Sequence, residues 1–138
     1  MAGPVTDGPH RNVNPDTLPR PIGYAHATVA AAGTTVYLGG QAGHRTDGSI
    51  AGGLVEQFDQ ACANVVEALR AVGGRPEHLV NLLIFATDVG EYRGLLSQLG
   101  TAWRGHFGKH YPAMALLGTT ELFDAEARVE LVGVAVIP

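Results

Sequence analysis

Residues 53–74 of the 138-residue chain are GLVEQFDQACANVVEALRAVGG. Apolar side chains recur at every third or fourth position of this stretch: Val55, Phe58, Cys62, Val65, Leu69 and Val72. This spacing places them on one face of an α-helix, and the two glycines at 73 and 74 supply its end. The stretch therefore predicts an amphipathic helix packed on the core, with Cys62 as a small apolar core residue.

The segments that follow predict three strands and a second helix. Residues 79–87 (LVNLLIFAT) are short, apolar and rich in branched side chains, as in a buried strand. A second helix is expected at about 90–107, with one apolar side made of Tyr92, Leu95, Leu96, Leu99 and Trp103. Residues 113–117, within the uncharged stretch YPAMALLGTT (111–120), and 129–137 (VELVGVAVI) predict two last core strands.

The N-terminal part predicts less regular structure. Residues 1–20 contain four prolines, which indicate an irregular lead-in with at most one short edge strand at about 11–13. In 25–40 (AHATVAAAGTTVYLGG) two β-prone runs flank Ala32 and Gly33 and predict a hairpin. Asp47 and Gly48 mark a tight turn.

The order of elements is therefore two strands, a helix, a strand, a helix and two strands. It predicts one α+β domain over residues 1–138, in which two helices cover one face of a mixed sheet. Two helices leave the other face without cover. We expect other copies of the chain to supply it, so that the protein is a homo-oligomer.

Composition narrows the partners. The chain is 46% hydrophobic and 16% charged, with a net charge of −4 and nine Lys plus Arg that form no basic cluster. A nucleic-acid-binding protein normally needs a positive patch, so we expect no nucleic-acid partner. The single cysteine excludes an internal disulfide, and no apolar run reaches membrane-spanning length. Residues 1–14 lack the features of a signal peptide, so a soluble, cytoplasmic protein is expected.

The search for reactive groups returns little. Cys62 lies in the middle of an apolar helix face, and Ser49 and Ser97 lie in no nucleophile motif. Phosphate-binding and dinucleotide motifs are absent, so no cofactor is expected. His106 and His110 stand four apart, but no third ligand can be named, and solvated histidines at a helix end are expected instead of a metal site.

Glu130 is a carboxylate in an apolar strand. Alternation places it on one face with Val132 and Val134, opposite Val129 and Leu131. A glutamate there is exposed at an edge or ion-paired, with Arg128 as the nearby candidate, or it lies in a pocket as a functional group. The strand pattern alone leaves both interpretations open.

Six short motifs, in their order and spacing, resemble the RidA family, also called YjgF/YER057c/UK114 and often labelled L-PSP endoribonuclease. They are PIGYAHA (21–27), VYLGGQ (36–41) followed by the DG turn, AVGG (71–74), FATD (85–88), YPA (111–113) and VELVGVAV (129–136). The resemblance spans about residues 21–136. It implies a chorismate-mutase-like (bacillus type) α+β fold and a homotrimer with clefts between its subunits.

The resemblance also implies a function and a site. Characterised members hydrolyse enamines and imines to ketoacids and ammonia. Matched by position, the family's cleft residues imply catalytic roles for Glu130 and Tyr24, given one residue inserted before the last strand. The substrate-binding positions implied are Gly39, Gly40, Gln41, Met114, Ala115 and Leu116.

The chain departs from the imine-hydrolysing members at the substrate clamp. Those members carry PAR, whose arginine holds the substrate carboxylate through two charge-assisted hydrogen bonds. Here the motif is Pro112, Ala113 and Met114, and methionine has no donor. Position 116, often polar or cysteine there, is Leu116, and Gly39 replaces a serine. Arg45 and Arg104 are the candidates for a substitute cation.

Three functions compete. The first is a hydrolase or deaminase of an imine, enamine or related metabolite, with Glu130 positioning water and Tyr24 orienting the substrate. The second is a non-catalytic trimer that binds a small molecule in an apolar cleft, which Met114 and Leu116 favour. The third, an endoribonuclease, is disfavoured by the acidic balance and by the lack of a basic stripe.

Overall fold

The computed structural model describes residues 8–138. Its elements in chain order are β1 (Arg11–Val13), β2 (Ala27–Val29), β3 (Thr34–Tyr37), α1 (Leu54–Ala71), the 3₁₀ helix η1 (Pro76–His78), β4 (Leu79–Ala86), α2 (Val89–Gly94), α3 (Leu96–Phe107), β5 (Ala113–Gly118) and β6 (Val129–Ile137).

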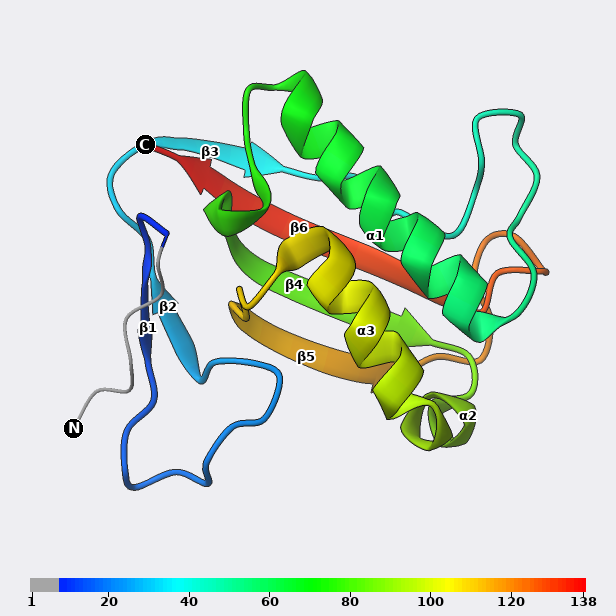
Figure 1. Cartoon of the computed structure of the whole chain (residues 1–138), viewed down its shortest axis with the longest axis horizontal. Coiled ribbons are helices and arrows are strands. Elements are labelled where there is room, and N and C mark those ends of the chain that lie inside the picture. The colour runs from blue at the N-terminus through cyan, green and yellow to red at the C-terminus, as the bar shows by residue number, and fades with distance from the viewer. Residues whose placement is uncertain (1–7) are drawn as a thin grey trace.

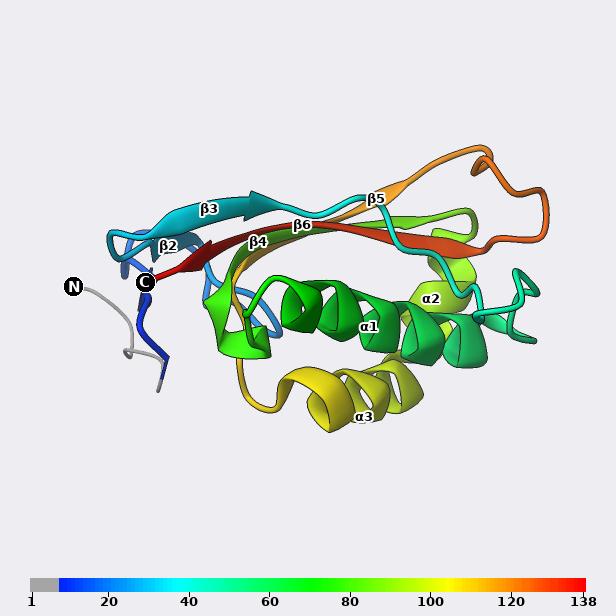
Figure 2. The same ribbon diagram turned by 90° about the horizontal axis from the view of Figure 1, so that it is seen from above.

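The main sheet has four strands in the order β3-β6-β4-β5. β6 is antiparallel to β3 and β4, and β4 is parallel to β5. Helices α1 and α3 lie together on one face of this sheet, and no helix of residues 8–138 lies on the other (Figures 1 and 2). The predicted α+β fold, a mixed sheet with two long helices on one face, is confirmed.

Helix α1 buries the face that its sequence predicts. Phe58, Cys62, Val65 and Leu69 are at most 1% exposed and belong to the central core cluster. Val72 is the exception, at 54% exposed, because α1 ends at Ala71 and the chain turns away at the following glycines. Burial raises the pKa of the Cys62 thiol, so this cysteine is a packing residue and no nucleophile.

The predicted hairpin at 25–40 is wrong. β2 pairs with β1 in a separate two-stranded sheet, whereas β3 pairs with β6. The segment between them carries the chain from one sheet to the other, and Gly33 packs so closely on the backbone of Ile137 that a Cβ would collide. Each arm has strand propensity, but its hydrogen-bonding partner lies far away in the sequence.

Two further expectations need correction. The second helix is broken at Leu95 (φ −120°) into α2 and α3, and the Asp88 side chain caps α2 by accepting from the Glu91 backbone N–H at 2.9 Å. Leu96 is consequently 57% exposed. β5 is an edge strand whose residues from Ala115 onward are exposed, so 111–120 does not form a central core strand.

The sheet face opposite the helices is partly apolar. On β6, Val129 and Leu131 point to the helices and are buried, while Glu130 and Val132 are half-buried on the open face. Tyr37 lies on the same open face, is 80% exposed, and pairs with β6 across the ladder. A homotrimer that covers this face stays a prediction. Among residues 8–138, no helix has the length and apolar character needed to cross a membrane.

Candidate functional site

An apolar cavity of about 710 Å³ lies between α3, β5 and the loop before β2. Four residues predicted for the site line it: Tyr24, Met114, Ala115 and Leu116. We call it the Tyr24 cavity. Most of its other walls are apolar or aromatic, including Ile84, Tyr92 and Trp103, which the resemblance did not bring to the site. Their only sequence signal was the apolar pattern of their own elements.

Tyr24 is held by backbone contacts on both sides. Gly23 adopts φ +77°, a left-handed conformation that few other residues accept. The Ala25 N–H then donates to the Pro112 carbonyl at 3.0 Å and ties the loop to the start of β5. The Tyr24 ring meets His26 edge-to-face, with ring centroids 5.4 Å apart. Tyr24 as a whole is 36% exposed and lines the cavity.

A hydrogen-bond relay fixes β5 beside this loop. The Thr28 hydroxyl donates to the Asn12 side-chain oxygen at 2.9 Å and accepts from the Ala113 N–H at 2.8 Å. The Asn12 amide in turn donates to the Tyr111 carbonyl at 2.9 Å. The small β1-β2 sheet thus holds the start of β5, where the predicted substrate-binding residues begin.

Met114 lies on the helix side of the sheet. It pairs with the buried Leu82 of β4 and packs against the core cluster. Leu116 pairs with Ile84 on the same side and is 37% exposed. The floor of the Tyr24 cavity is therefore apolar at both positions, and neither provides a donor for an anion.

The two candidate arginines differ in position. Arg104 of α3 lines the Tyr24 cavity, and its guanidinium donates to the Thr101 hydroxyl at 3.4 Å. Arg45 lies in the 45–50 turn, where it donates to the Ile50 carbonyl at 3.0 Å and does not line this cavity. Of the two, Arg104 is the cation placed beside Met114.

The other predicted residues form a second group. The Gln41 backbone pairs with Leu131 through two hydrogen bonds of 2.8 Å, which bring the 39–41 loop against β6. A Cβ at Gly40 would collide with the Glu130 carboxylate, whereas one at Gly39 would meet nothing within 4 Å. Glycine at position 40 thus leaves room for the carboxylate.

Glu130 lines a cavity of about 350 Å³ together with Gly40, His44, Phe123 and Asp124. We call it the Glu130 cavity. His44 Nε2 lies 3.1 Å from Asp124 Oδ2, while within residues 8–138 no side chain or backbone group bonds to the Glu130 carboxylate. The ion-paired reading of Glu130 is wrong, because Arg128 pairs with Glu91 at 3.0 Å instead.

Asp124, which lines the same cavity as Glu130, has a perturbed pKa. The Glu126 backbone N–H, and then His44, lower the pKa of Asp124, which keeps that carboxyl ionised. Sequence reasoning missed His44 and Asp124 as site residues, because they lie 80 positions apart and carry no motif.

One subunit does not bring the two groups together. Met114 pairs with Leu82 on the helix side of the sheet, whereas Glu130 pairs with Phe85 on the open face. The Tyr24 and Glu130 cavities share no lining residue. A site that uses both groups needs a second copy of the chain.

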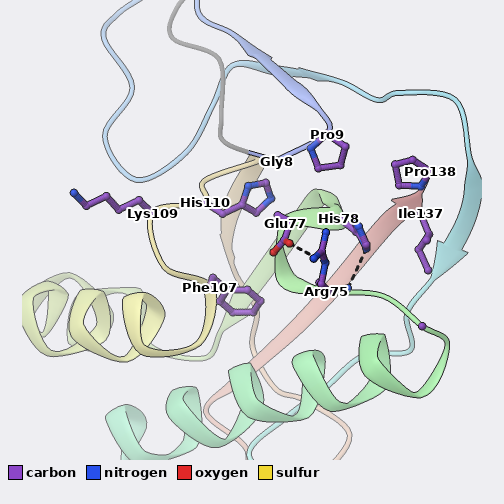
Figure 3. A pocket seen from close by; sticks show the side chains of 11 residues that line it. Gly8, Pro9, Arg75, Glu77, His78, Phe107, Lys109, His110, Ile137 and Pro138 are labelled. Atoms are coloured by element: carbon purple, nitrogen blue, oxygen red, sulfur yellow. Dashed lines mark hydrogen bonds and ion pairs between the residues drawn. The ribbon is translucent and has the colours of Figure 1, made fainter.

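A third cavity of about 930 Å³ lies near η1 and the end of α3 (Figure 3). Arg75, Lys109, His78 and His110 line it, and Arg75 pairs with Glu77 at 2.9 Å. The sequence predicted a solvated histidine at position 110, and this is wrong. His110 is buried, and its Nε2–H donates to the Leu79 carbonyl at 2.8 Å.

The paired histidines predicted as a helix-end feature do not converge. His106 bonds to Asp59 at 2.8 Å, away from His110. Within residues 8–138, no three His, Cys, Asp or Glu side chains lie close enough to hold a metal ion.

The buried histidines predict a pH-dependent stability. Burial lowers the pKa of His110, and burial followed by Arg75 lowers the pKa of His78. The unfolded chain takes up protons near the ordinary histidine pKa of about 6.5. The stabilisation is therefore complete above that pH and is lost as the pH falls toward the lower pKa values of the two histidines in the folded protein.

We expect the urea midpoint of unfolding to be lower at pH 5.5 than at pH 7.5. The difference between the two midpoints should be smaller in the His78→Gln/His110→Gln double variant than in the wild type. The same difference in both proteins would contradict the assignment to these histidines.

Comparisons with known proteins agree with one another. The family model described as "Endoribonuclease L-PSP" matches residues 17–137. A goat (Capra hircus) protein named 2-iminobutanoate/2-iminopropanoate deaminase is 28% identical over 104 residues, which are 74% of this chain and 72% of that protein.

Among solved structures, the conserved Rid-family protein YyfB of Yersinia pestis is similar with a TM-score of 0.80 at 27% identity, over 94% of this chain and 99% of that chain. RidA of a Psychrobacter species has a TM-score of 0.68 at 24% identity, over 92% and 99% of the two chains, a likeness of fold alone.

Proposed function

The chain belongs to the endoribonuclease L-PSP family, together with the Rid (YjgF/YER057c/UK114) proteins, and from this premise we propose that it hydrolyses or deaminates a small imine, enamine or related metabolite. The named activity of the goat relative supports this reaction class. In the proposal the protein is a cytoplasmic homotrimer, and the Tyr24 cavity of one subunit faces the Glu130 cavity of the next.

The observation that carries the proposal is the unpaired Glu130 carboxylate. It lies in a cavity beside Gly40 and has no hydrogen-bonding partner among residues 8–138. Glu130 is half-buried on a strand whose neighbouring residues are apolar, and a carboxylate held there without a described partner is available to position water or substrate. His44 and the ionised Asp124 line the same cavity and give it a polar wall to which water can bind.

The proposed chemistry is a hydrolysis. Glu130 takes a proton from water as the water oxygen bonds to the C=N carbon, and passes it to the nitrogen. Glu130 then takes the hydroxyl proton of the resulting carbinolamine and passes it to the nitrogen as the C–N bond breaks, so that ammonia leaves and a C=O group remains. In the proposal Tyr24 orients the substrate from the neighbouring subunit. Gly39, Gly40, Gln41, Ala115 and Leu116 shape the walls of the cleft.

The usual reaction on small 2-iminoacids, such as 2-iminopropanoate, is not the one proposed. Met114 offers no donor to a carboxylate, and the floor around it is apolar. A charge-assisted clamp contributes about 1.5–3 kcal/mol, so its loss slows small iminoacids by roughly one to two orders of magnitude. The apolar floor also supports the second candidate, a trimer that binds a small molecule without turnover.

One assay separates the two candidates. Imines are generated in situ from single amino acids by an amino-acid oxidase, and ketoacid release is followed with semicarbazide in competition. We expect weak activity with 2-iminopropanoate and measurable hydrolysis of at least one larger imine. Activity on 2-iminopropanoate equal to that of an arginine-containing deaminase would contradict the role given to Met114. Ligand binding without hydrolysis of any imine would support the binding protein.

A further inference from the structure

We propose that the substrate is a carboxylate with a bulky apolar side chain, and that Arg104 holds the carboxylate at the rim of the Tyr24 cavity while the side chain fills it. This inference rests on the proposed function, since it concerns the substrate of the same site. It transfers the anion-binding role from strand β5 to helix α3. Three properties of the molecule support it: the position of Arg104, the chemistry of the cavity walls and the size of the cavity.

The first property is the position of Arg104. Its side chain folds back along α3 toward Gly100. A Cβ placed on Gly100 would lie only 3.2 Å from the Arg104 Nη1 atom. Both residues line the cavity. Within residues 8–138 no carboxylate pairs with this guanidinium, whose recorded partner is the neutral Thr101 hydroxyl. Its charge is thus available to a ligand, and a planar guanidinium binds a carboxylate through two parallel hydrogen bonds.

The second property is the chemistry of the walls of the Tyr24 cavity. Ile22, Leu96 and Leu116 present exposed apolar surface to the cavity, while its other apolar lining residues Leu99, Trp103 and Ile84 are at most 4% exposed. Burial raises the pKa of Tyr92, at the same wall, to about 12, so its phenol stays neutral. Arg104 is accordingly the single cationic side chain that lines the described cavity. One fixed charge on an apolar surface selects an amphipathic anion.

The third property is the size of the Tyr24 cavity. A cavity of about 710 Å³ is within the range of sites that enclose ligands of drug-like size, about 300–1,000 Å³. A methyl side chain such as that of 2-iminopropanoate would leave most of this volume unfilled. A phenyl or branched alkyl group gains binding free energy by covering the exposed side chains of Leu96 and Leu116. Charge, surface and size therefore all favour a bulky side chain.

Isothermal titration with 3-phenylpropanoate, a stable carboxylate with no C=N bond, tests the inference without requiring turnover. We expect binding to the wild type and about tenfold weaker binding to Arg104→Ala, a modest loss because the guanidinium is exposed. 3-Phenylpropanamide, which has the ring without the charge, should bind both proteins alike. Propanoate, which has the charge without the ring, should bind more weakly than 3-phenylpropanoate.

The matched control is Arg93→Ala, which removes an exposed arginine of α2 outside the cavity lining and should leave all affinities unchanged. Equal affinity of wild type and Arg104→Ala for 3-phenylpropanoate, equal binding of propanoate, or no binding at all would overturn the inference. Arg104-dependent binding without hydrolysis of the imine made from phenylalanine would instead contradict the proposed function and leave the ligand class standing. Hydrolysis of that imine at the same rate in wild type and Arg104→Ala would support the proposed function and overturn the role of Arg104.

Discussion

Replacement of Glu130 by glutamine is expected to lower imine hydrolysis by about 10²–10⁴-fold, the usual contribution of a positioned general base. Glutamine has nearly the same shape and cannot accept a proton from water. Glu130 lies on the open face of β6 without a partner among residues 8–138, so the change breaks no described interaction and the fold should persist. Initial rates on the best imine, with thermal unfolding as the check of folding, measure the effect.

Two glycine variants provide a matched pair for this prediction. Gly40→Ala places a methyl group against the Glu130 carboxylate and should displace that flexible side chain, reducing the rate without unfolding the protein. Gly39→Ala adds the same methyl group to the preceding residue, where it meets nothing within 4 Å, and should lower the rate much less than Gly40→Ala. Full activity in Glu130→Gln, or equal losses in both glycine variants, would remove Glu130 from the mechanism.

Met114→Arg should raise the hydrolysis of 2-iminopropanoate by about 10–100-fold, the value of a charge-assisted clamp on a carboxylate. Met114 is half-buried at the floor of the Tyr24 cavity, and the cavity gives a longer side chain space to reach its centre. The measurement is kcat/KM for 2-iminopropanoate in the variant and the wild type. We expect the main effect on small iminoacids, which cannot reach Arg104 at the rim while filling the floor.

Met114→Leu is the control, because it conserves volume and apolar character and adds no donor. It should leave the rate on 2-iminopropanoate unchanged. Arg104 is the charged neighbour most able to oppose a new arginine, so Met114→Arg is also combined with Arg104→Ala. If neither form gains activity while both remain folded, the missing clamp is not what limits the reaction on small iminoacids.

Much of the architecture could be predicted from local patterns. The three-and-four spacing in 53–74 identified the buried face of α1, since Phe58, Cys62, Val65 and Leu69 are all in the core. Strand alternation likewise predicted the face on which Glu130 lies. These patterns are reliable because each one records, in neighbouring residues, which side of an element faces the core.

Predictions that depended on distant partners were less successful. The run 25–40 has the composition of a hairpin, yet its arms pair with β1 and β6, and composition does not specify a partner. The apolar stretch 113–118 became an edge strand because its place in the sheet order, not its composition, decides how much of it is covered. The break at Leu95 follows Gly94, but one glycine within an apolar helical pattern did not distinguish a break from a continuous helix.

The sequence by itself determined the fold class, the family resemblance and the residue types of the candidate site, including the methionine in place of an arginine. Only the tertiary structure separated Met114 from Glu130 on opposite faces of the sheet, and it alone chose Arg104 over Arg45 as the nearby cation. The physical reason is that a repeat along the chain reports burial, whereas the meeting of two side chains depends on strand order, register and helix placement. Those are set by contacts between residues far apart in the sequence.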